Sequence, residues 1–120
     1  MDLKEYMERF EKSTKDFDSF CLQYLDKKTT SIVNQAKKRT PVKTGALRAS
    51  WKGNKAVKAG RTYRSKIING QSYASFIEYG TSRGIKPYNM VTVPVQSFQR
   101  NVQKDFEKAV TEHFRKEGIY

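Results

Sequence analysis

Cysteine and histidine are almost missing from this chain. Of its 120 residues, one is a cysteine (Cys21) and one is a histidine (His113). A single cysteine excludes an internal disulfide and a cysteine-rich zinc site. Proton-transfer chemistry has little to draw on with one histidine, so the composition argues against an enzyme. We expect Cys21 to be a buried structural thiol and His113 to be a surface or boundary residue.

Long apolar runs are missing as well. No stretch approaches the roughly 20 apolar residues that a membrane helix needs, and the first residues do not form the apolar core of a secretory signal. We therefore expect a protein that is soluble and cytoplasmic at synthesis and that contacts no membrane. Leucine is scarce, with four residues, whereas the chain has seven Tyr and seven Phe. Aromatic rings are therefore expected to supply much of the buried surface.

Acidic residues are absent from the middle of the chain. From Lys27 to Ile77, a segment that we call the basic block, there are thirteen Lys and Arg and no Asp or Glu, while the whole chain has a net charge of +12. Such a charge requires a polyanion, a partner of opposite sign or solvent. Contact with DNA phosphates and contact with an acidic neighbour both stay open. The residues that we expect to make these contacts are Lys37, Lys38, Arg39, Lys43, Lys52, Lys58, Arg61, Arg64 and Lys66.

The spacing of apolar residues predicts a single α+β domain over residues 1–120, with a helix at each end. Residues 1–39 form a long N-terminal helical region, as one helix or two consecutive ones, and Pro41 is expected to end it near Arg39. Residues 94–117 form a C-terminal amphipathic helix that packs on a small antiparallel sheet.

Between these helices, residues 50–93 are predicted to contain the sheet, a short helix and a loop. Strands are expected at about 50–58 and 61–68, joined by a turn at Ala59–Gly60 and carrying basic side chains on their outer faces. A short helix is expected over 73–80, ended by Gly80. A loop then covers 81–90, and Met90–Val93 is interpreted as a last short strand.

Residues 40–50 are expected to form a loop in which Gly45 adopts a positive φ angle. Two interpretations of this segment stay open. It is either a loop with Leu47 and Trp51 docked on the core, or an arm that contacts another copy, with Arg48 beside Trp51 as an interface pair. Glu78, the first acid after the basic block, is expected either to pair with a basic side chain such as Arg48 or to be a solvent-exposed carboxylate.

Two motifs carry a resemblance to a known family. The first is Thr40–Pro41–Val42–x–Thr44–Gly45–x–Leu47–Arg48–x–Ser50, and the second is Tyr73–Ala74–x–x–Ile77–Glu78–Tyr79–Gly80–Thr81. Together they resemble the neck and minor tail-component family of long-tailed bacteriophages and prophages, the lambda gpZ-like head–tail joining proteins. The resemblance covers roughly residues 25–115. It departs after Gly80, since Val95 stands where the family commonly has alanine.

The resemblance implies a non-enzymatic structural protein of the virion with an α+β fold and no cofactor or metal. Such a protein acts in head–tail joining or tail completion, as part of a ring around the DNA channel. Its partners would be other copies of itself and the connector, head-closure and tail proteins, first in the cytoplasm of the bacterial host and then in the neck or tail of the virion. The residues implied as fold and assembly determinants are Thr40, Pro41, Thr44, Gly45, Leu47, Arg48, Ser50, Trp51, Tyr73, Ala74, Ile77, Glu78, Gly80 and Thr81.

An alternative function follows from charge alone. The chain would then be a small non-specific nucleic-acid-binding protein, with Trp51 and Tyr63 interleaved among the basic residues. An RNA-cleaving toxin is a weaker third hypothesis, because it would have to transfer protons with Tyr, Glu, Arg and the lone His113.

Overall fold

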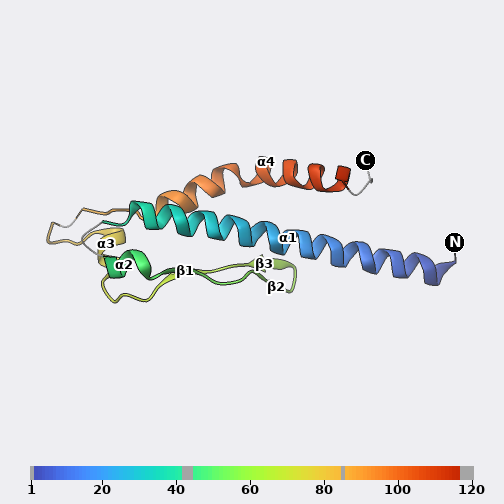
Figure 1. Ribbon diagram of the computed structural model, residues 1–120, viewed down its shortest axis with the longest axis horizontal. Coiled ribbons are helices and arrows are strands. Elements are labelled where there is room, and N and C mark those ends of the chain that lie inside the picture. Colours follow the sequence, from blue (N-terminus) through green and yellow to red (C-terminus); the bar gives the residue numbers. More distant parts are fainter. Residues whose placement is uncertain (1, 42–44, 85, 117–120) are drawn as a thin grey trace.

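One helix of 37 residues, α1 (Leu3–Arg39), sets the shape of the molecule (Figure 1). The structure is a computed structural model that describes residues 2–41, 45–84 and 86–116. The molecule measures 69 × 23 × 23 Å, with a Cα radius of gyration of 19.1 Å. A compact chain of this length would have a radius of gyration of about 14 Å. The protein is therefore a rod with an α+β fold.

The strands form one long interrupted hairpin that lies along α1. Strand β1 (Trp51–Gly53) pairs antiparallel with β4 (Ile67–Asn69), and β2 (Val57–Ala59) pairs antiparallel with β3 (Thr62–Arg64). Between the two pairs, the N–H of Asn54 donates to the carbonyl of Lys66 at 2.7 Å. The tip turns at Gly60, whose φ is +63°. The two predicted strands and their turn are therefore confirmed, with a break in the middle of each strand.

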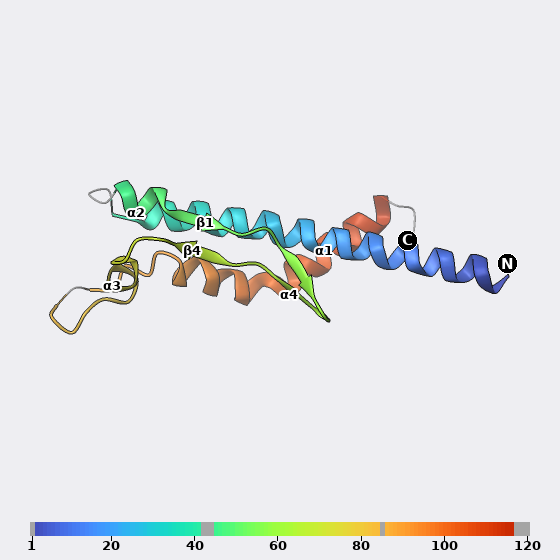
Figure 2. The same ribbon diagram turned by 90° about the horizontal axis from the view of Figure 1, so that it is seen from below.

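The remaining elements are helices. Short helices α2 (Gly45–Ala49) and α3 (Ala74–Tyr79) lie near the C-terminal end of α1, and α4 (Thr92–Lys116) runs back along it. Figure 1 shows α1 between the hairpin and α4, and Figure 2 shows that the first turns of α1 project beyond both. None of the helices in the described ranges is long and apolar enough to span a membrane.

Helix α1 is continuous through a stretch of weak helix formers. The Thr29 hydroxyl donates to the Leu25 carbonyl at 2.8 Å, and the Thr30 hydroxyl donates to the Asp26 carbonyl at 3.0 Å. Both hydroxyls are thus satisfied by carbonyls of the helix itself, which costs the helix only a little stability and does not break it. Thr29 is also buried under the hairpin, where it hydrogen-bonds Ser65. Tertiary packing therefore decides in favour of one helix over two.

Two local predictions were wrong. Gly45 does not take a positive φ angle in a loop, because residues 45–49 form α2, built from good helix formers such as Ala46 and Leu47. Met90–Val93 is not a strand, since α4 already begins at Thr92. The backbone N–H groups of Tyr88 and Asn89 instead donate to the carbonyls of Ile77 and Glu78 in α3.

The other helix boundaries follow the sequence closely. Helix α1 ends at Arg39, just before Pro41, and Thr40 is already extended. Helix α3 ends at Gly80, whose φ is +76°. Pro94 lies in the first turn of α4, where its missing N–H costs nothing. Residue 117, the expected last residue of that helix, lies outside the described part of the chain.

The core lies at one end of the rod. A cluster that we call the junction consists of Val33, Ala36, Leu47, Trp51 and Met90, and Leu47, Ala36 and Met90 are completely buried. The hairpin approaches α1 closely beside it. A Cβ on Gly53 would lie 2.6 Å from Cγ2 of Thr29, so a side chain at this position has no room. Leu47 and Trp51 are therefore docked on the core, as one of the two interpretations predicted.

Helix α4 packs on α1, which lies between α4 and the hairpin, and not on the sheet as predicted. Aromatic rings make this contact. Phe106 lies 6.0 Å from Phe20 and 5.0 Å from Tyr24, measured between ring centroids. The ring of His113 lies 4.6 Å from that of Phe20. Since Phe20 and Tyr24 both come from α1, aromatic stacking holds the two helices together in place of the usual leucine layer.

Candidate assembly surfaces

The two signature motifs meet at the junction. Thr40 is 2% exposed, and its hydroxyl donates to the Ala36 carbonyl at 2.7 Å while accepting a hydrogen bond of 2.9 Å from Nε1 of Trp51. The indole is thereby fixed against the end of α1. Because Trp51 is 5% exposed, it cannot serve as an interface anchor beside Arg48. That interpretation of the segment was wrong for Trp51.

Arg48 caps the C-terminal end of α1, and Arg39, in the last turn of α1, holds the loop before α4. Nε of Arg48 donates to the Lys37 carbonyl at 3.0 Å, and Nε of Arg39 donates to the carbonyl of Asn89 at 3.1 Å. The last carbonyls of a helix have no partner within it, and a cation there also favours the helix dipole. Arg48 therefore satisfies backbone groups, and it also ties α2 to α1.

Glu78 plays a part that neither sequence hypothesis foresaw. Its carboxylate is 3% exposed and accepts hydrogen bonds from the N–H of Thr92 at 2.8 Å, the N–H of Val91 at 3.1 Å and the Thr92 hydroxyl. It thus caps the start of α4, where unpaired N–H groups and the helix dipole favour negative charge. A pair with Arg48 and a solvent-exposed carboxylate are both wrong. No local signal marks a cap so far before its helix.

The other signature residues surround the same cluster. Tyr73, Ala74 and Ile77 pack partly buried against the junction. The Ser50 hydroxyl donates to the Ala46 carbonyl at 2.7 Å and accepts from Nε2 of Gln71 at 2.9 Å. The remaining members are placed as follows: Pro41 follows α1, Gly45 begins α2, Gly80 and Thr81 follow α3, and Thr44 and Lys43 lie outside the described residues.

An exposed group of rings lies just outside this cluster. Phe76 and Tyr79 of α3 are 55% and 70% exposed, and Tyr88 in the following loop is 48% exposed. We call these three residues the aromatic patch. The sequence did not mark them as exposed, because Phe76 shares its helical face with Tyr73 and Ile77, which pack against the junction. Exposed rings gathered at one end of a molecule are typical of a contact surface.

Most of the basic residues expected to make contacts lie on the outer face of the hairpin, at its tip or in the last turn of α1. Lys52, Arg64 and Lys66 are exposed and alternate with inward-facing residues, so they lie on the outer face. Arg61 is exposed at the tip, while Lys37, Lys38 and Arg39 lie in the last turn of α1.

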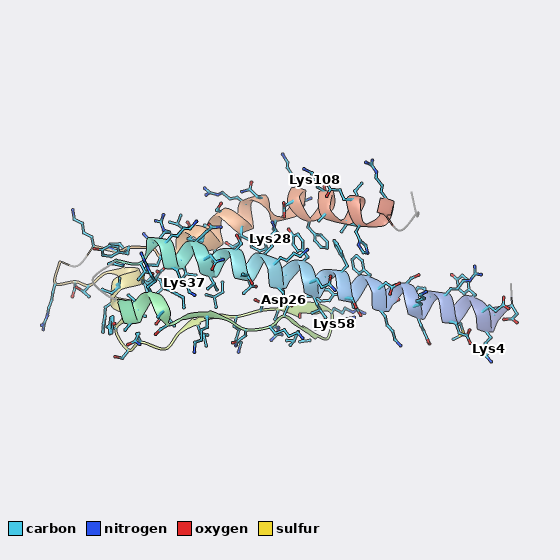
Figure 3. All side chains as sticks on the ribbon, viewed as in Figure 1. Lys4, Asp26, Lys28, Lys37, Lys58 and Lys108 are labelled. Atoms are coloured by element: carbon cyan, nitrogen blue, oxygen red, sulfur yellow. The ribbon has the colours of Figure 1, made fainter. Side chains whose placement is uncertain are left out.

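Lys58 is the exception among the basic hairpin residues. Its Nζ lies 3.0 Å from Oδ2 of Asp18 in α1. Figure 3 labels Lys58 on the hairpin beside α1. The Tyr63 hydroxyl also donates to this carboxylate. The hydrogen bonds from Tyr63 and Lys58 hold the pKa of Asp18 below its usual value. Lys58 is thus engaged by its own chain, and the outer face is left to the other cations.

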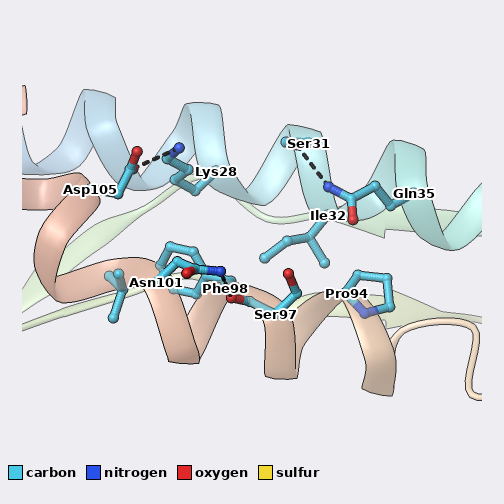
Figure 4. A pocket seen from close by; sticks show the side chains of 10 residues that line it. Lys28, Ser31, Ile32, Gln35, Pro94, Ser97, Phe98, Asn101 and Asp105 are labelled. Carbon is cyan, nitrogen blue, oxygen red and sulfur yellow. Dashed lines mark hydrogen bonds and ion pairs between the residues drawn. The ribbon is translucent and has the colours of Figure 1, made fainter.

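A second set of charges lies between α1 and α4. Nζ of Lys28 is 2.7 Å from Oδ2 of Asp105, which also accepts a hydrogen bond of 2.5 Å from the Tyr24 hydroxyl. Both contacts lower the pKa of Asp105. Figure 4 shows the shallow depression beside them, a cavity of about 160 Å³ between Ile32 and Phe98. Within the described ranges, no three His, Cys, Asp or Glu side chains gather in a way that could hold a metal ion.

Cys21 is buried, as predicted, on the face of α1 that lies beside Tyr63 of the hairpin. Burial raises the pKa of its thiol. A raised pKa leaves less of the reactive thiolate at neutral pH, so the arrangement disfavours a nucleophile.

Comparison with known proteins identifies the family of the chain. The model of a family described as "Bacteriophage HK97-gp10, putative tail-component" matches residues 3–80, which include α1, the hairpin, α3 and most of both signature motifs. No curated protein and no solved structure is matched. The matched residues make up well over half of the 120, and α4 lies beyond them. The chain belongs to the HK97-gp10-like family of bacteriophage tail components.

Proposed function

We propose that this protein is a structural part of a phage or prophage virion that acts in head–tail joining or tail completion. It does so as one subunit of a ring around the DNA channel, in the manner of lambda gpZ-like joining proteins. The observation that supports this most is the exposure of large apolar side chains at both ends of the rod, in a chain of the phage tail-component family. The protein needs no catalytic residue for this role.

The two ends carry different apolar surfaces. At one end, the aromatic patch exposes three rings, and at the other end, α1 exposes Leu3 and Phe10 by 73% and 64%. A subunit with two unlike contact surfaces far apart can touch two neighbours at once, which is the requirement for a ring or for a link between two layers of an assembly. The signature residues support this indirectly, because they hold the aromatic patch in place.

The outer face of the hairpin gives the subunit a charged side. Lys52, Arg64 and Lys66 lie there in a part of the sequence that has no acid. In a ring this face would meet either DNA or an acidic neighbouring protein. We favour the protein neighbour, because a strongly positive channel would hold back the DNA that has to pass through it.

Removal of the gene tests the proposal. A phage that lacks the protein should accumulate separate heads and tails, and the wild-type gene supplied in trans should restore joined particles. The Phe76→Ser/Tyr79→Ser variant should fail to restore them. The Gln99→Ser/Gln103→Ser variant, at two exposed positions of α4, should succeed. Normal joining of heads to tails without the gene would contradict the proposal.

The basic hairpin keeps a second function open, non-specific binding of nucleic acid. If it holds, the affinity for duplex DNA falls with salt by about one unit of log–log slope per phosphate contact. The Lys52→Gln/Arg64→Gln/Lys66→Gln variant should then bind more weakly. The Lys4→Gln/Lys12→Gln/Lys15→Gln variant removes the same charge from exposed positions of α1 and should bind like the wild type. Equal loss in both variants would indicate general charge attraction only.

A further inference from the structure

The first part of α1 is a helix without cover. Every residue from Asp2 to Asp16, a segment that we call the arm, is exposed, and Figures 1 and 2 show it projecting beyond the hairpin and α4. It nevertheless carries an apolar stripe. The exposed fractions are 73% for Leu3, 60% for Tyr6, 53% for Met7 and 64% for Phe10. An exposed stripe of this size on a helix marks a binding surface.

The stripe has the spacing of a coiled coil and runs on into the body. Apolar side chains, with Thr14 as the one polar member, follow one another at alternating steps of four and three residues, which is the heptad pattern of helices that pair along a seam. The members are Leu3, Met7, Phe10, Thr14, Phe17, Cys21 and Tyr24. The arm supplies the first half of this seam, and the part of α1 that lies within the body supplies the second half.

The second half of the seam forms the floor of an open groove. Phe17 and Cys21 of α1 lie at its base, Tyr63 of β3 forms one wall, and Phe98 and Phe106 of α4 form the other. We call this groove the trough. Its volume is about 330 Å³. The arm and the trough therefore lie end to end on one face of a single straight helix.

We propose that two copies of this chain pair antiparallel through α1, so that the arm of each copy lies in the trough of the other. Turning one α1 end for end brings the arm of each copy onto the trough of the other at the same time, which makes the contact two-fold and self-complementary. The bodies then lie at opposite ends of the pair. In a parallel pair shifted by two heptads, the parts that contain the hairpin and α4 would lie against each other, so the antiparallel arrangement is favoured.

The contact area suits a stable pair. Four large side chains, each more than half exposed, give each arm on the order of 400 Å² of apolar surface. They are the rings of Tyr6 and Phe10 and the aliphatic side chains of Leu3 and Met7. The two arms alone would bury about 800 Å² of apolar surface, and the surfaces that receive them would add to this, toward the 1,200–2,000 Å² that is usual for a specific protein–protein interface. The pair rests on the proposed function in one respect, because it names a second copy of the chain as the neighbour that the arm contacts, while the aromatic patch stays available for other virion parts.

The molar mass in solution tests the pairing. The full-length wild type should rise from 13.9 kDa toward twice that value as its concentration increases, as measured by light scattering after size exclusion. The Met7→Gln/Phe10→Gln variant should stay at the lower mass. The Glu5→Gln/Lys12→Gln variant changes two exposed residues on the opposite side of the arm, leaves the net charge unaltered and should pair like the wild type.

Two results of this experiment would overturn the pairing. One is a wild type that stays at 13.9 kDa at every concentration. The other is a larger assembly whose mass is unchanged by Met7→Gln/Phe10→Gln, which would leave the ring proposal intact but assign its contacts to another surface.

Distances between spin labels test the antiparallel direction. Labels on Ser13→Cys, in a Cys21→Ser background that still pairs, should lie close together, because residue 13 is near the two-fold axis. Labels on Glu5→Cys should lie at least about 20 Å farther apart, given a rise of 1.5 Å per residue and an offset of about eight residues on each helix. Short and equal distances at both positions would show a parallel pair and overturn the proposal.

Discussion

At the two ends of α1, similar apolar residues have opposite surroundings. Near the C-terminal end, Val33 and Ala36 are 7% and 0% exposed beneath the hairpin and the loop before α4. At the other end, Leu3 and Phe10 follow the same helical spacing and are 73% and 64% exposed. The difference lies in what the rest of the chain provides. Two signature motifs and Met90 converge on the junction, whereas the hairpin tip reaches only to Asp18 and leaves the arm uncovered.

This contrast separates stability from assembly within one helix. Residues at the junction complete a closed core, so their contribution appears in the free energy of unfolding of the single chain. Residues on the arm gain contacts only when a partner arrives, so we expect their contribution to appear in an association constant. Two of the predictions below compare a change at the junction with a matched change on the arm, and the third concerns the border between the two.

The largest difference is expected between Trp51→Ala and Phe10→Ala. Trp51 is 5% exposed and hydrogen-bonded to Thr40, so its truncation should lower the free energy of unfolding by about 3–5 kcal/mol. Phe10→Ala should change it by less than about 0.5 kcal/mol, because the ring is 64% exposed. Urea unfolding, followed by circular dichroism at low protein concentration, measures both. A comparable loss in the two variants would mean that the arm is covered within its own chain.

The sequence predicts most of the elements that build the junction. Pro41 indicates where α1 ends, Gly80 indicates where α3 ends, and the turn at Ala59–Gly60 divides the hairpin. Leu47 and Trp51 are recognisable as apolar anchors because they are large residues four positions apart in a basic segment. In each case a local rule of backbone conformation or spacing is enough.

The contacts between distant segments are beyond such rules. Glu78 caps a helix that starts fourteen residues later, and the preference for a cap is visible only once α3 and α4 are placed together. Met90 opens the strand that the sequence predicts at Met90–Val93, yet it is completely buried in the junction, just before α4. The exposure of the arm was equally hidden, because an apolar stripe indicates burial without saying whether the partner is the same chain.

Glu78→Gln should have a smaller effect than Trp51→Ala. The amide keeps one acceptor oxygen but loses the charge and places an N–H₂ donor against the backbone N–H groups of Val91 and Thr92. We expect a loss of about 1–2 kcal/mol in the free energy of unfolding. The same exchange at Glu8, which is exposed on the arm, should change it by less than about 0.5 kcal/mol. Equal stability of Glu78→Gln and the wild type would show that the cap contributes nothing.

The smallest predicted effect concerns Asp18, where the arm meets the body. The hydrogen bonds from Tyr63 and Lys58 lower the pKa of this carboxyl in the folded protein, so the folded state binds its proton less readily than the unfolded chain does. The stabilisation is therefore present above the unfolded pKa of about 3.9 and is lost as the pH falls through the lower folded pKa. Amide hydrogen exchange at the hairpin tip should accordingly lose protection below about pH 4, relative to the junction.

Asp18→Asn should weaken the tip at neutral pH and remove this part of the acid response. Because Lys58 and Asp18 are partly exposed, high salt should reduce the difference between the two proteins. An identical acid response in Asp18→Asn would show that the carboxylate does not hold the hairpin tip to α1, and the border between arm and body would then rest on Tyr63 and its apolar neighbours alone.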